Sequence, residues 1–191
     1  MNRAARSSRR QGYCDCALFA SLELSGFRLA GTDGERHALA SFEAAPVLVV
    51  VVSCNHCPHV VAYEERIVAI SREYASRGVA FVAVNANDAS RYPADDMAHM
   101  IERATQRGFD FPYLRDDSQA FVRALGARFT PEVFVFDRAR KLRYHGRIDD
   151  NEREPRAVRH HDLKDAIEAL LAGQEPAVAD TQAIGCSVKW K

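Results

Sequence analysis

The chain has 191 residues, of which 47% are hydrophobic, and this is enough apolar material for one large packed domain. Its 26 basic residues match its 26 acidic ones, but four arginines stand among the first ten residues without an acid, so the remainder carries 22 basic and 26 acidic residues. The sequence therefore excludes a basic field for nucleic acid or an acidic membrane, and it lacks the 18 or more apolar residues of a spanning helix.

Residues 1–20 are expected to form a flexible N-terminal tail. Arginines followed by a modest apolar patch are typical of signal and transit peptides, but Asp15 interrupts the patch and no small-residue cleavage site follows. We therefore expect a cytoplasmic protein. An uncleaved, organellar or exported N-terminal segment stays open as the alternative.

The first half of the chain predicts a hairpin followed by a βαβ unit. Asp33 and Gly34 lie between apolar runs, which indicates an antiparallel hairpin before Pro46. The run "VLVVVVS" is typical of a central strand buried on both faces. An amphipathic helix over 58–77, a buried strand over 79–88 and a second helical stripe then follow, and they make the two strands parallel. The second stripe consists of Met97, Met100, Ile101 and Ala104.

The second half predicts a hairpin and a closing helix. "FPYL" reads as a short extended segment, and a helix beginning near Asp117 or Ser118 is expected to end at Gly126. "TPEVFVFD" and "KLRYHGRI" read as two strands joined by a turn, and apolar spacing from Leu163 predicts a last helix. We therefore expect an α/β domain over 21–175 with a mixed central sheet, and a C-terminal tail over 176–191 packed on it.

Cys54 and Cys57 carry the chemistry that the sequence predicts. They form a Cys-x-x-Cys between the central strand and the start of a helix. Helix N-termini stabilise anions, so we expect the pKa of Cys54 to fall, with Cys57 less exposed and one turn further on. His56 would favour the thiolate, and Pro58 suits the first helical turn, where its missing N–H is not needed. An accessible thiolate with a second thiol nearby can exchange disulfides with a partner protein.

The other cysteines and histidines are assigned more weakly. Cys14 and Cys16 are expected to be incidental, while Cys186 either packs beside Trp190 or serves as a third thiol. A structural zinc site commonly pairs Cys-x2-Cys with a second matching pair, and the chain offers none. His160 and His161 are expected at the surface rather than as metal ligands. Asp149, Asp150 and Asn151 are expected to form a solvated turn, and the alternative is that one of them lines the rim of the active site.

Taken together, these segments resemble the thioredoxin fold, in particular the redoxin family with its peroxiredoxin-like and cytochrome-maturation-type members. The resemblance covers about residues 22–191 and is carried by "CNHCP", "VAFVAVNAND", "FPYL", "TPEVFVFD", "YHGRIDDN", "HDL" and "GCSVKW". Bacterial proteins described as thioredoxin-family proteins or probable thiol-disulfide isomerases share this pattern. The fold class that it implies is a three-layer α/β/α thioredoxin-like domain with an N-terminal hairpin extension.

The resemblance also implies roles for individual residues. Cys54 would be the nucleophile and Cys57 the resolving thiol, with Asn55 and His56 in supporting positions. Pro131 would be cis and face the cysteines, and the backbone of Thr130 would pair with an extended substrate peptide.

Two positions depart from the family's patterns. Thioredoxin has a buried Asp six residues before its first cysteine, where this chain has Leu48, so proton handling must differ. Peroxiredoxins carry a Thr three residues before the reactive cysteine, where this chain has Val51, which weakens a peroxidase reading.

The leading hypothesis is a thiol-disulfide oxidoreductase that exchanges disulfides with a protein partner through Cys54 and Cys57. It uses a redox-active disulfide and no cofactor or metal, and its partners are protein disulfides or dithiols and a reductant. One alternative is a thiol peroxidase in which Cys54 becomes a sulfenic acid. The second alternative is a non-enzymatic module whose cysteine pair holds zinc or a static bond.

Overall fold

A seven-stranded mixed sheet forms the centre of the computed structural model, which describes residue 24 and residues 26–191. The strand order is β2-β1-β5-β4-β3-β7-β8, and β6 pairs separately with β9. The strands are β1 (Arg28–Gly31), β2 (Arg36–Ala38), β3 (Leu48–Val52), β4 (Ala80–Asn85), β5 (Tyr113–Arg115), β6 (Phe129–Thr130), β7 (Glu132–Phe136), β8 (Leu142–Gly146) and β9 (Cys186–Ser187). The helices are α2 (Pro58–Ala75), α3 (Met97–Arg107), α4 (Ala120–Leu125) and α5 (Asp162–Leu171), with short 3-10 turns at Leu39–Phe42, Pro93–Asp95 and Pro155–Ala157.

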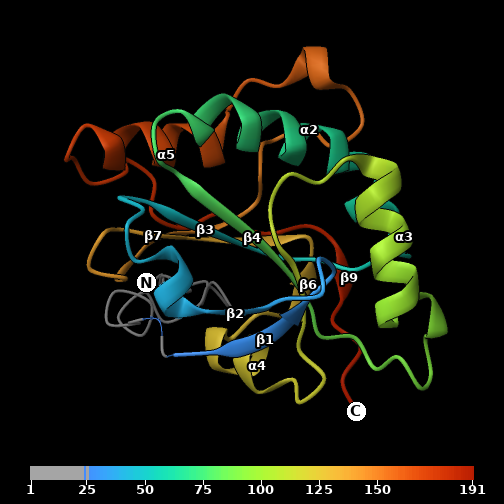
Figure 1. Cartoon of the computed structure of the whole chain (residues 1–191). Coiled ribbons are helices and arrows are strands. Elements are labelled where there is room, and N and C mark those ends of the chain that lie inside the picture. The colour runs from blue at the N-terminus through green and yellow to red at the C-terminus, as the bar shows by residue number, and fades with distance from the viewer. Residues whose placement is uncertain (1–23, 25) are drawn as a thin grey trace, which may run out of the picture.

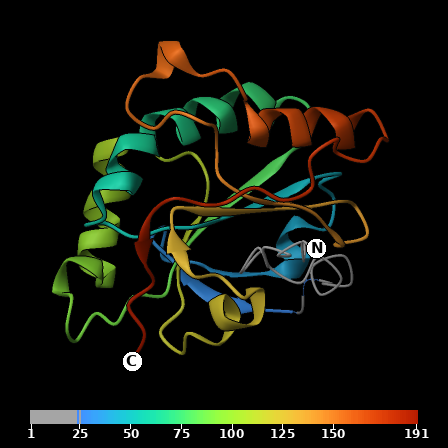
Figure 2. The ribbon, with the colours of Figure 1, turned by 180° about the vertical axis from the view of Figure 1, so that it is seen from behind.

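Strand β3 is the centre of the core, as its continuous valine run predicts. Val49 and Val51 join the apolar cluster under α2, α3 and α5, whereas Leu48, Val50 and Val52 join the cluster under α4. Alternate residues of a strand point to opposite faces, so a strand covered on both faces is apolar throughout. Figure 1 and Figure 2 show α2 and α5 on one face of the sheet and α4 on the other. The α/β/α arrangement predicted from the sequence is confirmed.

The pairing of the strands also follows the predicted order. β3 pairs parallel with β4 and antiparallel with β7, and β7 pairs antiparallel with β8. β1 and β2 form the expected hairpin, with Gly34 in its turn at φ +83°. The extended segment "FPYL" supplies β5, which joins this hairpin to β4.

Helix α4 begins later than the sequence predicts. Gln119 has a left-handed backbone, with φ +62°, so the helix starts at Ala120 rather than near Asp117 or Ser118. The Gln119 side chain donates to the carbonyls of Ala86 and Lys189 and so links this turn to the C-terminal segment.

The segment after α5 returns across the sheet in extended conformation (Figure 2, red). Ala179 and Thr181 exchange backbone hydrogen bonds with His145 at the edge of β8, and β9 then pairs antiparallel with β6. Within the described residues, no helix has the length and apolar character needed to cross a bilayer.

Candidate active site

Cys54 and Cys57 lie in the connection between β3 and α2. Ser53 extends the sheet by donating its N–H to the Val84 carbonyl, and the chain then leaves the sheet. Cys57 is the N-cap residue of α2, with Pro58 in the first helical position. The free N–H groups of the helix terminus therefore lie beside Cys57 rather than beside Cys54, where the stabilised anion was expected. The helix end stabilises an anion at Cys57 more than at Cys54.

Both cysteines are buried, contrary to the expectation of an accessible pair. Cys54 is 1% exposed and Cys57 0%, whereas Cys186 keeps part of its surface. Val60 and Cys186 pack against the pair. The expectation fails because the C-terminal strand covers the pair, and this strand is too short and irregular to leave a periodic pattern in the sequence.

Thr130 faces the cysteines, and its peptide bond to Pro131 is cis, as the resemblance implies. The Thr130 hydroxyl lies 3.4 Å from the sulfur of Cys54, and the Thr130 carbonyl accepts a hydrogen bond from the Cys57 thiol at 3.1 Å. Thr130, at the end of β6, therefore contacts both sulfurs.

The resemblance implied that the backbone of Thr130 is free to pair with a substrate peptide. In the structure this backbone edge is already occupied. Strand β9 pairs with β6 (Figure 1), and Cys186 is the register partner of Thr130. The sulfurs of Cys57 and Cys186 are 2.7 Å apart. Cys186 packs against the cysteine pair, whereas Trp190 packs against the apolar cluster under α4.

Asp95 is a site residue that the sequence analysis missed. It is fully buried, and its carboxylate accepts a hydrogen bond from the Asn55 N–H at 2.7 Å and contacts His56 Nδ1 at 2.6 Å. The His56 ring stacks on Tyr92, with the centroids 5.4 Å apart. Asp95 lies 40 residues from the cysteines, and the neighbouring Asp96 shows the ordinary N-cap role, accepting the His99 N–H. No local signal distinguishes Asp95 from a second capping residue.

Asn55 connects the cysteine loop to the same buried network. Its side chain donates to the Ala94 carbonyl at 2.7 Å and accepts from the Tyr113 hydroxyl at 2.9 Å. Asn85 and Asn87 donate to the Asp95 carboxylate. The supporting positions expected for Asn55 and His56 thus coincide with contacts to a buried carboxylate.

Cys54, His56 and Asp95 also form a potential metal-binding cluster, since their ligand atoms lie within 4.8 Å of one another. The two Asp95 oxygens already accept hydrogen bonds from three donors, and the second also contacts His56. A metal ion would have to displace several of these contacts. The arrangement therefore fits the positioning of the Cys54 loop better than metal binding.

The surroundings set the pKa values of the two cysteines in opposite directions. The hydrogen bond with Cys57, burial and the Asp95 carboxylate raise the pKa of Cys54. The hydrogen bond from Cys54 lowers the pKa of Cys57, and Cys186 and the Val60 N–H lower it further, against the effect of burial. The prediction that the pKa of Cys54 is lowered is therefore wrong for the protein with reduced cysteines. The thiolate forms more readily on Cys57.

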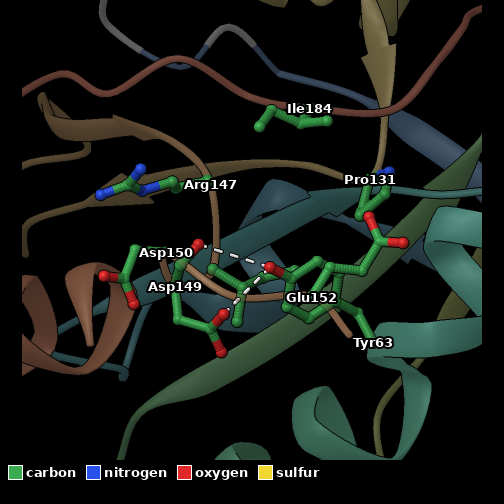
Figure 3. A pocket seen from close by; sticks show the side chains of 8 residues that line it. Tyr63, Pro131, Arg147, Asp149, Asp150, Glu152 and Ile184 are labelled. Atoms are coloured by element: carbon green, nitrogen blue, oxygen red, sulfur yellow. Dashed lines mark hydrogen bonds between the residues drawn. The ribbon is translucent and has the colours of Figure 1, made fainter. Parts of the chain in front are cut away.

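A surface pocket lies beside Pro131 and is lined by Tyr63, Ile184 and the loop of residues 147–152 (Figure 3). Ile184, in the C-terminal segment, is 62% exposed. Asp149 is buried and binds Arg66 and Tyr63, so it is not part of a solvated turn as expected. The hydrogen bonds from Tyr63 and Arg66, both on α2, compensate the buried charge of Asp149.

The remaining predicted residues lie away from the cysteine pair. His160 and His161 are exposed before α5, as expected. Cys14 and Cys16 lie outside the described residues.

Comparisons with known proteins identify the class of this fold and then the family. The peroxidoxin BcpB of Mycobacterium tuberculosis superposes with a TM-score of 0.55 at 17% identity, covering 78% of this chain and 92% of the other. A putative thiol:disulfide interchange protein DsbE of Chlorobium tepidum gives 0.58 at 18% identity, covering 79% and 94%. These likenesses show a thioredoxin-like fold. The redoxin family model matches residues 20–165, and the chain belongs to the redoxin family.

A more similar solved structure comes from a protein of undetermined function. A hypothetical protein of Sinorhizobium meliloti 1021 is 36% identical, with a TM-score of 0.84, over 88% of this chain and 93% of the other. An uncharacterized conserved protein of Geobacillus kaustophilus is 35% identical, with the same TM-score, over 89% and 91%. No curated protein matches the chain. Family membership supports a thiol redox function and suggests a redox enzyme.

Proposed function

We propose that the protein is a thiol-disulfide oxidoreductase that exchanges disulfides with a protein partner through Cys54 and Cys57. The observation that carries the proposal is the placement of these two thiols between the central strand and α2, where both sulfurs contact Thr130, the residue before the cis proline. In this proposal the cysteines themselves carry the two electrons as a dithiol and release them on forming the disulfide. Names of fold neighbours such as the thiol:disulfide interchange protein point to the same class of substrate.

In the reducing direction, Cys54 attacks a sulfur of the partner's disulfide, and the partner's other sulfur leaves as a thiolate. The Cys57 thiolate, hydrogen-bonded to the Cys54 thiol, accepts the proton as Cys54 reacts. Cys57 then loses this proton to the departing thiolate, attacks Cys54 and releases the reduced partner. Two electrons pass to the partner and the Cys54–Cys57 disulfide remains.

His56 and Asp95 would position the loop that carries Cys54. His56 lies between the buried Asp95 carboxylate and the Tyr92 ring, and Asn55 is tied to the same carboxylate. This network takes the place of the buried Asp before the first cysteine that thioredoxin has and this chain lacks. The Asp95 charge also disfavours a Cys54 thiolate.

Trapping of mixed disulfides tests the proposal. A Cys57→Ser variant, mixed with a disulfide-containing protein such as insulin, should accumulate adducts linked through Cys54, because the resolving thiol is gone. The variant Cys54→Ser with Cys57→Ser serves as the control and should form no such adduct at this pair. If peptide mapping finds no adduct through Cys54, the proposal is wrong.

The burial of Cys54 favours one second candidate, a thiol peroxidase. At 1% exposure the sulfur is better placed for a small oxidant than for a protein, and the Thr130 hydroxyl lies 3.4 Å away. The Cys54 thiolate would attack hydrogen peroxide to give a sulfenic acid and hydroxide, and Cys57 would then displace water to form the disulfide. Stopped-flow mixing with peroxide decides: a rate no faster than that of a free thiol excludes this candidate.

A further inference from the structure

Cys186 lies where it can react with the cysteine pair. Its sulfur is 2.7 Å from that of Cys57, which is closer than ordinary van der Waals contact between sulfurs. Cys57 therefore has Cys186 as a neighbour in addition to Cys54, to which it is hydrogen-bonded. Of these three thiols, only Cys186 keeps part of its surface exposed.

The segment that carries Cys186 is held on both sides of it. Before Cys186, Thr181 and Ala179 form hydrogen bonds with the backbone of His145 on β8. After it, the Val188 N–H donates to the Arg128 carbonyl at 2.9 Å and the Lys189 N–H to the Asn87 side chain at 2.8 Å. The Cys57–Cys186 contact is thus part of a fixed strand rather than the end of a loose tail.

Gly185 allows this strand to approach the cis-proline loop. A Cβ atom at Gly185 would lie 2.3 Å from the carbonyl oxygen of Thr130 and 3.2 Å from the nitrogen of Pro131. Only a residue without a side chain fits at this distance. Cys186 then lies opposite Thr130 in the β6–β9 register and directs its sulfur at Cys57.

We propose that Cys186 is a third redox thiol, which forms a disulfide with Cys57 and carries electrons between the buried pair and a protein dithiol at the surface. The inference rests on the proposed Cys54–Cys57 couple. When this couple is oxidised, the Cys186 thiolate attacks the sulfur of Cys57, the Cys54–Cys57 bond breaks and Cys54 leaves as a thiolate. The exchange moves the disulfide to Cys57–Cys186 without any net oxidation, and the proton of Cys186 passes to Cys54.

The second step uses a dithiol protein as reductant. One of its thiolates attacks the partly exposed sulfur of Cys186 and releases Cys57 as a thiolate. Its second thiol then attacks the mixed disulfide, so that Cys186 is restored and the reductant departs as a disulfide. Two electrons reach the buried couple although Cys54 and Cys57 never contact the reductant.

Disulfide mapping in a Cys54→Ser variant tests the second disulfide. After mild oxidation with diamide, digestion without reductant should yield a peptide pair that joins Cys57 to Cys186 as the main intramolecular disulfide. Free Cys57 and Cys186 thiols under these conditions, in protein with an unchanged circular dichroism spectrum, would overturn the inference.

A matched control moves the thiol by one residue. In the variant Cys54→Ser with Cys186→Ser and Ser187→Cys, the new thiol lies on the exposed side of β9, because successive strand residues face opposite ways. It should form no bond with Cys57. If it bonds as completely as Cys186 does, the pairing reflects a mobile tail and the inference fails.

Reduction kinetics of the otherwise intact protein provide the second readout. We expect the oxidised Cys186→Ser variant to be reduced by a thioredoxin about tenfold or more slowly than the wild type, relative to its reduction by a small phosphine, because the exposed sulfur is missing. An unchanged ratio overturns the relay. If the wild-type protein exchanges disulfides with insulin through Cys54 and Cys57 but forms no Cys57–Cys186 disulfide, only this inference is refuted. If the Cys57–Cys186 disulfide forms but the protein does not exchange with insulin, only the proposed function is refuted.

Discussion

Cys54 and Cys57 have different surroundings, although three residues separate them. Cys57 lies at the helix N-terminus, whereas Cys54 lies near the buried Asp95 carboxylate. The sequence identified both thiols correctly because a Cys-x-x-Cys between a strand and a helix is a local signal. It assigned the lower pKa to the wrong one, because the neighbouring Cys57 thiol, burial and the Asp95 carboxylate, which comes from a distant turn, raise the pKa of Cys54.

We predict that an Asp95→Asn variant lowers the pH at which Cys54 reacts. A negative charge close to a buried sulfur disfavours its thiolate, and here the Asp95 carboxylate raises the pKa of Cys54. The Cys54 alkylation rate, followed against pH by mass spectrometry, should therefore rise at lower pH in the variant. Asp96→Asn is the matched control, since it loses only an exposed helix cap and should leave the profile unchanged. An unshifted profile in Asp95→Asn contradicts the assignment.

Among the elements, those with a strong period or a turn signal were predicted well. The valine strand, the amphipathic helix before Gly78 and the Asp-Gly hairpin all lie within a few residues of their expected bounds. Strand β9 has two residues and depends on a contact with β6, which is more than 50 residues away in the chain, so no periodicity could reveal it. The sequence singled out Cys186 as a possible third thiol, but it gave no sign of the strand that carries it.

We predict that a Gly185→Val variant opens the site. The valine side chain cannot fit against the Thr130 carbonyl, so β9 should leave β6 and expose the buried thiols. Alkylation of Cys54 and Cys57 should become about tenfold faster or more, which corresponds to about 1.4 kcal/mol weaker docking. Gly26→Ala, where a Cβ meets nothing within 4 Å, is the control and should have no effect. Alkylation that stays slow in Gly185→Val would show that β9 does not cover the pair.

At the scale of the whole molecule, the C-terminal segment joins the edge of the sheet to the site. His145 on β8 lies between Glu132 and Asp180, at 2.7 Å from each. Burial alone would lower the pKa of His145, but its hydrogen bonds to the two carboxylates and their charges raise it above 6.5. The hydropathy pattern could predict the strand but not this interaction, because its partners come from three separate segments.

We predict that this histidine makes the anchoring of the segment dependent on pH. Because the folded pKa is raised, its stabilisation is complete below pH 6.5 and is lost as the pH rises through the folded value. The difference in urea unfolding free energy between wild type and Asp180→Asn should therefore be larger at about pH 6 than at about pH 9. The control Glu175→Gln removes an exposed ion pair with Arg143, and its unfolding free energy should differ little from that of the wild type at either pH. Equal differences for Asp180→Asn would contradict the account.

Redox titration of the wild-type protein tests the central claim most directly. The protein is equilibrated with glutathione buffers of graded potential, quenched and alkylated, and the state of each cysteine is read from its peptide. The account predicts that Cys54 and Cys57 lose their thiols together in one reversible two-electron transition and are recovered as a linked peptide. If both remain alkylatable thiols in the most oxidising buffer, the protein has no redox couple at this site.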